Sequence, residues 1–67
     1  MDYEKDILEI RDELEKLSNR IIETIKNEDI GDYITMYGAT NEALWNAMKI
    51  IDTVMSLKAE EEEDESQ

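Results

Sequence analysis

The sequence contains no cysteine, no histidine and no proline, and it has only two glycines among its 67 residues. Without cysteine there is no disulfide, and without cysteine or histidine the usual ligands of a structural zinc site are missing. A chain this short buries little apolar surface to offset its conformational entropy, so small domains without such cross-links commonly gain stability by associating. We therefore expect the chain to self-associate or to fold against a partner.

Long apolar runs and basic charge are also scarce. No run approaches the length of about 20 residues that a membrane-spanning helix needs, and the opening Met1-Asp2-Tyr3-Glu4 is acidic where a secretory signal is basic and then apolar. Seven Lys and Arg residues stand against 19 acids, for a net charge of −12, which disfavours direct contact with nucleic acid or an anionic membrane. The sequence thus predicts a soluble, cytoplasmic protein (in the host cytoplasm if it is viral), with neither nucleic acid nor membrane as a direct partner.

The negative charge is concentrated at the C-terminal end. Residues 1–29 carry ten acids and five bases, net −5, and residues 30–59 carry a net −1. Glu60 to Glu65 are six acids in succession, net −6. Because repulsion within such a run opposes regular structure, we expect a folded domain over residues 1–59 followed by a disordered acidic tail over 60–67.

Residues 3–27 carry the strongest structural signal. Their apolar side chains recur at alternating spacings of three and four, which is the a/d pattern of helices that pair. Acids near the start suit the positive end of the helix dipole, and Asp12 precedes Lys16 by four residues, the favourable order for a helical ion pair. The pattern predicts one helix over 3–27, with an apolar stripe formed by Ile7, Ile10, Leu14, Leu17 and Ile21.

The middle of the chain predicts a break and then a second helix. Gly31 suits the left-handed conformation that ends helices, and Asp32 could cap a short helical turn over 32–37 that Gly38 closes. Thr40 or Asn41 is typical of an N-cap, which predicts a helix over 41–59. Its apolar residues cover about half of the circumference, more than an ordinary surface helix shows, so we expect it to pack against more than one neighbour.

These elements predict an all-α fold, a helical hairpin that pairs with a second hairpin into a four-helix bundle and homodimer. The sequence leaves open whether the helices pair within one chain or swap between two. The layout resembles that of Rop-type hairpins in arrangement only, because the basic helical face that Rop-like RNA binding needs is missing. The expected self-association residues are Ile7, Ile10, Leu14, Leu17 and Ile21 on the first helix and Leu44, Met48, Ile51, Val54 and Met55 on the second.

One acidic cluster has a spacing that resembles a metal site. Glu9-Ile10-Arg11-Asp12-Glu13 is loosely similar to the first half of the motif of MazG-type pyrophosphohydrolases, which hold magnesium with E-x-x-E on one helix and E-x-x-D on another. Asp52 stands without a second acid, so the other half is missing, and a magnesium site needs carboxylates that converge. The cluster therefore reads as a solvated helix face. With no Gly-rich phosphate loop and neither histidine nor cysteine, the sequence predicts no catalytic residue, no metal and no cofactor.

Aromatic and methionine side chains offer a candidate binding surface. Trp45 projects toward the polar side of the second predicted helix, beside Asp52. Exposed aromatic residues commonly anchor protein interfaces, although the same residues could instead close the loop end of the hairpin. The candidate partner-binding residues are Trp45, Tyr33, Met36 and Tyr37, together with the acids Glu9, Asp12 and Glu13.

The sequence favours a non-enzymatic protein that self-associates and binds another protein, as a regulator or inhibitor. A partner with a basic surface would complement its charge. One alternative is an acidic mimic of nucleic acid that blocks a basic cleft, as some phage-encoded anti-CRISPR and anti-restriction proteins do. Another is a structural subunit of a larger helical assembly.

Overall fold

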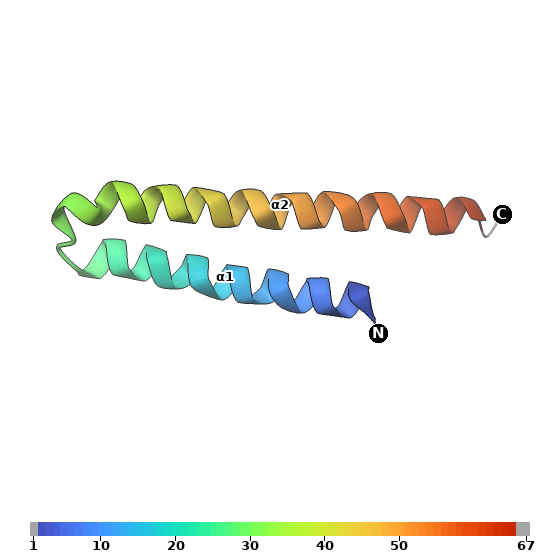
Figure 1. Cartoon of the computed structure of the whole chain (residues 1–67), viewed down its shortest axis with the longest axis horizontal. Helices are drawn as coiled ribbons and strands as arrows, with labels where there is room; N and C mark the ends of the chain where they lie inside the picture. The colour runs from blue at the N-terminus through green and yellow to red at the C-terminus, as the bar shows by residue number, and fades with distance from the viewer. Residues whose placement is uncertain (1, 66–67) are drawn as a thin grey trace.

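The protein is a long hairpin of two antiparallel helices (Figure 1). The computed structural model describes residues 2–65, with the side chains of residues 2–61. Helix α1 spans Tyr3–Asn27, a short 3-10 helix η1 spans Gly31–Tyr33, and helix α2 spans Ile34–Glu65. The described residues contain no strand, so the predicted all-α hairpin is confirmed.

Helix α1 has the bounds that the sequence predicts. Asp2 caps its start, since the Asp2 side chain accepts a hydrogen bond of 3.2 Å from the backbone N–H of Lys5. The helix ends where Glu28 becomes extended and its N–H donates to the carbonyl oxygen of Thr24. The ion pair of Asp12 with Lys16 is also present, at 3.1 Å.

The connection agrees with the prediction at Gly31 only. Gly31 has a φ of 54°, the left-handed conformation that glycine adopts without strain. The predicted separate turn over 32–37 is wrong, because α2 begins at Ile34 and continues through Gly38. Thr40 is a helix-interior residue and no cap, with its hydroxyl donating to the carbonyl oxygen of Met36 at 2.8 Å.

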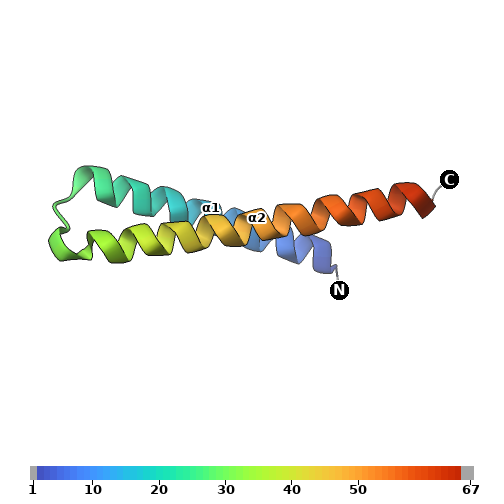
Figure 2. The same ribbon diagram turned by 90° about the horizontal axis from the view of Figure 1, so that it is seen from above.

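The second helix is therefore longer than predicted at both ends. It extends to Glu65 where the sequence predicts an end at Ala59 and a disordered tail; residues 66–67 of that tail lie outside the described part. No glycine or proline follows Gly38, and glutamate is a good helix former, so nothing local stops the helix. Figures 1 and 2 show the C-terminal turns of α2 continuing past the start of α1.

The core is a single seam between the two helices. Among the side chains that the structure describes, only Ser18, Ile21 and Met48 are fully buried. Half-buried residues continue the seam on both helices: Leu14, Ile22, Ile25, Tyr37, Asn41, Leu44, Ile51 and Met55. Two helices cannot enclose more than one such row, so the hairpin leaves many apolar side chains exposed.

Candidate interaction surfaces

One side of the hairpin is joined by an ion pair between the helices. The guanidinium of Arg11 on α1 donates from Nε to Oδ1 of Asp52 at 2.7 Å and from Nη2 to Oδ2 at 3.1 Å. Its Nη1 also donates to Glu15 at 3.3 Å, one turn along α1. This two-pronged geometry gives the pair directional specificity, and it fixes how α1 and α2 are aligned. We call this side of the hairpin the polar face.

The ion pair shifts the pKa values of both of its side chains. The hydrogen bonds from Arg11, with its positive charge, lower the pKa of Asp52 below its ordinary value, against a smaller opposing effect of desolvation. In turn Asp52, with a smaller contribution from Glu15, raises the pKa of Arg11. Both side chains remain in contact with solvent, so the pair orients the helices more than it stabilises them.

Trp45 lies on the polar face and is 51% exposed. It borders a shallow hollow together with Arg11, Lys49 and Asp52. The sequence correctly places Trp45 beside Asp52. Its exposed indole sits among charges of both signs.

The predicted aromatic binding set is divided between two sides of the molecule. Tyr33, Met36 and Tyr37 line a different hollow near the connection, with Ile21 and Thr40. Met36 and Trp45 are nine residues apart on one helix, so their side chains point in opposite directions. A single partner contact surface cannot be built from all four residues.

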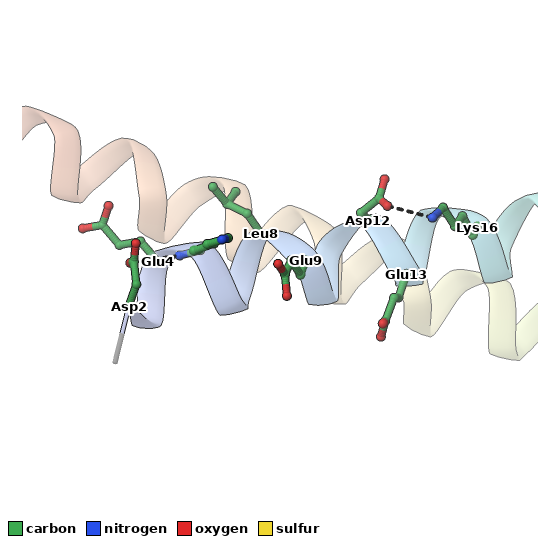
Figure 3. Close-up of a pocket in the computed structure, with 8 residues that line it drawn as sticks. Asp2, Glu4, Leu8, Glu9, Asp12, Glu13 and Lys16 are labelled. Carbon is green, nitrogen blue, oxygen red and sulfur yellow. Dashed lines mark hydrogen bonds and ion pairs between the residues drawn. The ribbon is translucent and has the colours of Figure 1, made fainter.

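The acids Glu9, Asp12 and Glu13 lie on the outward side of α1 (Figure 3). The view shows Asp12 turned toward Lys16 and away from Glu13. No group of three acidic side chains that could hold a metal ion occurs among the described residues. Glu9, Asp12 and Glu13 are exposed to solvent on this side of α1.

The side opposite the polar face is apolar. On α1, Ile10 and Leu17 lie on one side of the buried seam while Arg11 lies on the other, as a rotation of about 100° per residue requires. On α2, Val54 and Asp52 are separated by the seam in the same way. Because Arg11 bonds to Asp52, the remaining flanks of the two helices must also adjoin.

We call this second side the apolar face. It extends from the open end of the hairpin, where α1 begins, to the loop end, where the two helices connect. Its exposed members are Tyr3, Ile10 and Leu17 on α1, Tyr33 in the connection, and Met36, Ala43, Ile50, Val54 and Leu57 on α2. Ile50 is 63% exposed and Val54 is 56% exposed. All of these exposed members except Ala43 are large apolar side chains, and the geometry of the two helices places them on one side of the seam.

The open end of the apolar face is hollowed into a groove. Tyr3 and Ile7 from α1 and Ile50, Val54 and Met55 from α2 line it, and the wall is almost wholly apolar. At one edge, Lys58 forms an ion pair with Glu4 at 2.5 Å. The groove has a volume of about 340 Å³, enough to accept one or two large side chains.

The structure divides the predicted self-association residues between the seam and the apolar face. Those in or beside the seam are Ile7, Leu14, Ile21, Leu44, Met48, Ile51 and Met55, whereas Ile10, Leu17 and Val54 lie on the apolar face. The apolar stripe of α1 is therefore wide enough to contact α2 on one side and a second neighbour on the other. The prediction did not distinguish these two roles.

A polar pair inside the seam was missed by sequence reasoning. Ser18 is 1% exposed, and its hydroxyl donates to Oδ1 of Asn41 at 2.5 Å. Asn41 was predicted as a helix cap, but it lies inside α2 and faces α1. Its spacing of three residues before Leu44 and seven before Met48 places it in the heptad row, the signal by which it could have been found.

Comparison of the chain with protein-family models, with curated proteins and with solved structures found no match. Neither helix, over the residues described, includes a stretch long and apolar enough to cross a bilayer.

Proposed function

We propose that the chain is a non-enzymatic interaction protein that pairs with a second copy through its apolar face and offers its polar face to another protein. The observation that carries the proposal is the continuous apolar face, which no element of the described chain covers. Contiguous exposed apolar surface on this scale is typical of protein contact sites.

The exposed area of the chain supports self-association. The chain exposes 5709 Å², whereas a compact monomer of its mass, 7.9 kDa, exposes about 4,400 Å². Part of this excess belongs to the acidic turns of α2 that continue past α1 (Figures 1 and 2). The exposed side chains of the apolar face contribute to the rest, and pairing of two hairpins into a four-helix bundle would bury those side chains.

The chemistry of the side chains supports a binding role over a catalytic one. The pKa of Asp52 is lowered by its hydrogen bonds from Arg11, which keeps this carboxylate ionised in the pair. Catalytic acids and bases are instead tuned toward neutral pH by burial or by like charges. The polar face offers an exposed Trp45 on a chain of net charge −12, which suits a protein partner with a basic surface and a regulatory or inhibitory role.

Self-association can be tested with two matched variants. Ile50→Glu places a charge on the apolar face, whereas Leu8→Glu places the same charge at a residue 51% exposed on the outer side of α1 (Figure 3). Both variants lose one exposed apolar side chain and gain one negative charge. Molar mass by light scattering and helicity by circular dichroism would be followed together across a dilution series.

We expect a dimer for the parent chain and for Leu8→Glu. In Ile50→Glu the dimer dissociation constant should rise by about 30-fold or more, because a charge buried in an apolar contact costs at least about 2 kcal/mol. A parent chain that is a stable helical monomer at all concentrations would refute the self-association. Equal weakening by the two variants would refute the assignment to the apolar face.

The partner contact on the polar face has its own test. Proteins captured by the tagged chain would be re-bound to the purified Trp45→Ala variant and to the parent chain. An aromatic anchor predicts a loss of about 2 kcal/mol, near 30-fold in affinity, with little dependence on salt. Binding that is unchanged by the substitution would exclude Trp45 from the contact.

A further inference from the structure

We infer that the second copy lies on the apolar face in antiparallel orientation, so that the loop end of each hairpin covers the open end of the other. This inference rests on the self-association proposed above and adds the geometry of the pair. Twofold symmetry allows two orientations of the two hairpins. In a parallel pair the two loop ends lie together, and in an antiparallel pair they lie at opposite ends.

Repulsion between the acidic C-terminal segments favours the antiparallel orientation over the parallel one. Glu60 to Glu65 carry six negative charges, and this part of α2 continues past the open end of the hairpin (Figures 1 and 2). A parallel pair would bring both acidic segments together at one end. An antiparallel pair separates them by the length of α1, about 37 Å for 25 residues, which is several times the screening length of about 8 Å at physiological salt.

The distribution of the apolar side chains agrees with the same orientation. The open-end groove lined by Tyr3, Ile50 and Val54 is almost wholly apolar, and it needs a large apolar side chain to fill it. At the loop end, Tyr33 and Met36 are exposed by 62% and 63%. In an antiparallel pair these side chains of one copy lie over the groove of the other, and symmetry forms the contact twice. A parallel pair would place each groove opposite another groove.

The centre of the apolar face allows the helices to come close. Ala43 and Ala47 lie about midway along α2 between the two ends of the hairpin. The distance between packed helices depends on the size of the side chains at the contact, within about 8–10 Å. Small residues near the twofold axis would let the two α2 helices approach, while the larger residues toward each end fill the space there.

The orientation can be measured with one label per chain, because the chain has no cysteine. Asp29→Cys adds an attachment site at an exposed residue in the connection. A spin label there would report the distance between the two loop ends. Asn46→Cys, exposed near the middle of α2, is the matched control, since the two orientations place its labels at similar separations.

We expect the two Asp29→Cys labels to lie about 40 Å apart, as the length of a 25-residue helix implies. A dimer with a separation below about 20 Å would overturn the antiparallel orientation and leave the self-association standing. A monomeric mass for both labelled chains would overturn the inference and the self-association together. Light scattering on the same samples distinguishes these two failures.

Discussion

At the scale of single residues, the two glycines differ in their backbone conformation. Gly31 adopts a φ of 54°, whereas Gly38 lies in the interior of α2 with ordinary helical backbone. A Cβ atom added at either position would meet no atom within 4 Å apart from the adjacent residues and the local helix backbone. The effect of a side chain at these sites is therefore set by the backbone alone, which makes them a matched pair.

Alanine should act in opposite directions at the two glycines. Gly31→Ala forces a side chain into the left-handed region and should destabilise the fold by about 1–2 kcal/mol. Gly38→Ala removes the conformational freedom of a helical glycine and should stabilise it by up to about 1 kcal/mol. Urea unfolding followed by circular dichroism, at one protein concentration, would measure both. Equal signs for the two variants would contradict the backbone assignment.

The ion pair of Arg11 with Asp52 should make stability depend on pH in a defined window. The pKa of Asp52 is lower in the folded state than its ordinary value of 3.8. Such a carboxylate stabilises the fold above its unfolded pKa, and this contribution is lost as the pH falls through the folded pKa.

We expect Asp52→Asn to be less stable than the parent chain at pH 7, and the difference to vanish as the pH falls below about 4. The free energy of unfolding of both chains would be measured between pH 2 and pH 7. Comparing the two chains cancels the titration of the other carboxylates. A difference that persists unchanged at pH 2 would show that the loss has another cause.

At the scale of elements, the sequence predicted α1 and only part of α2. The bounds of α1 follow from local signals, the cap at Asp2 and the break before Gly31, so they could be read from nearby residues. The start of α2 could not, because Gly38 and Thr40 are tolerated inside a helix once the turns on either side are formed. Propagation of a long helix is cooperative, and a single glycine or capping residue within it does not end the helix.

The sequence predicted which residues take part in the candidate surfaces, but it did not predict how the folded hairpin arranges them. The apolar stripe of α1 is wide enough to serve two neighbours, and the pairing of Arg11 with Asp52 shows that Ile10 and Leu17 lie on the other side of the seam from that ion pair. That bond joins residues 41 positions apart, so no local pattern could reveal it. The separation of Met36 from Trp45 follows from the continuity of α2 through Gly38, which the sequence did not predict.

The hydrogen-bonded pair of Ser18 and Asn41 in the seam should stabilise the alignment of α1 with α2. Asn41→Ala removes the acceptor of the hydrogen bond from the hydroxyl of Ser18, a residue that is 1% exposed. We expect a loss of about 1 kcal/mol, since Ser18 is left with its own helix as the source of acceptors. Thermal or urea unfolding would measure the loss. Thr53→Ala, where the hydroxyl bonds within its own exposed turn, is a control that should change stability by less than about 0.5 kcal/mol.

At the scale of the whole molecule, the net charge of −12 on 67 residues opposes the compact state through self-repulsion. Screening by salt should relieve this repulsion, so we expect the melting temperature to rise between about 50 and 500 mM NaCl. A chain that ends at Ala59 lacks six of the acids and should show a smaller rise. Melting temperatures that fall with salt in both chains would mean that attractive surface pairs dominate.

Because the seam is narrow, the stability of the fold should depend on the concentration of the protein. With three fully buried side chains among those described, a lone hairpin has little interior to hold it, and a partner copy would supply the rest. If the second copy pairs as proposed, folding is a bimolecular equilibrium, in which each tenfold rise in concentration adds about 1.4 kcal/mol of apparent stability. A chain built in this way would be folded when it is abundant and would unravel, open to proteolysis, as its level falls, so that its working lifetime depends on its expression.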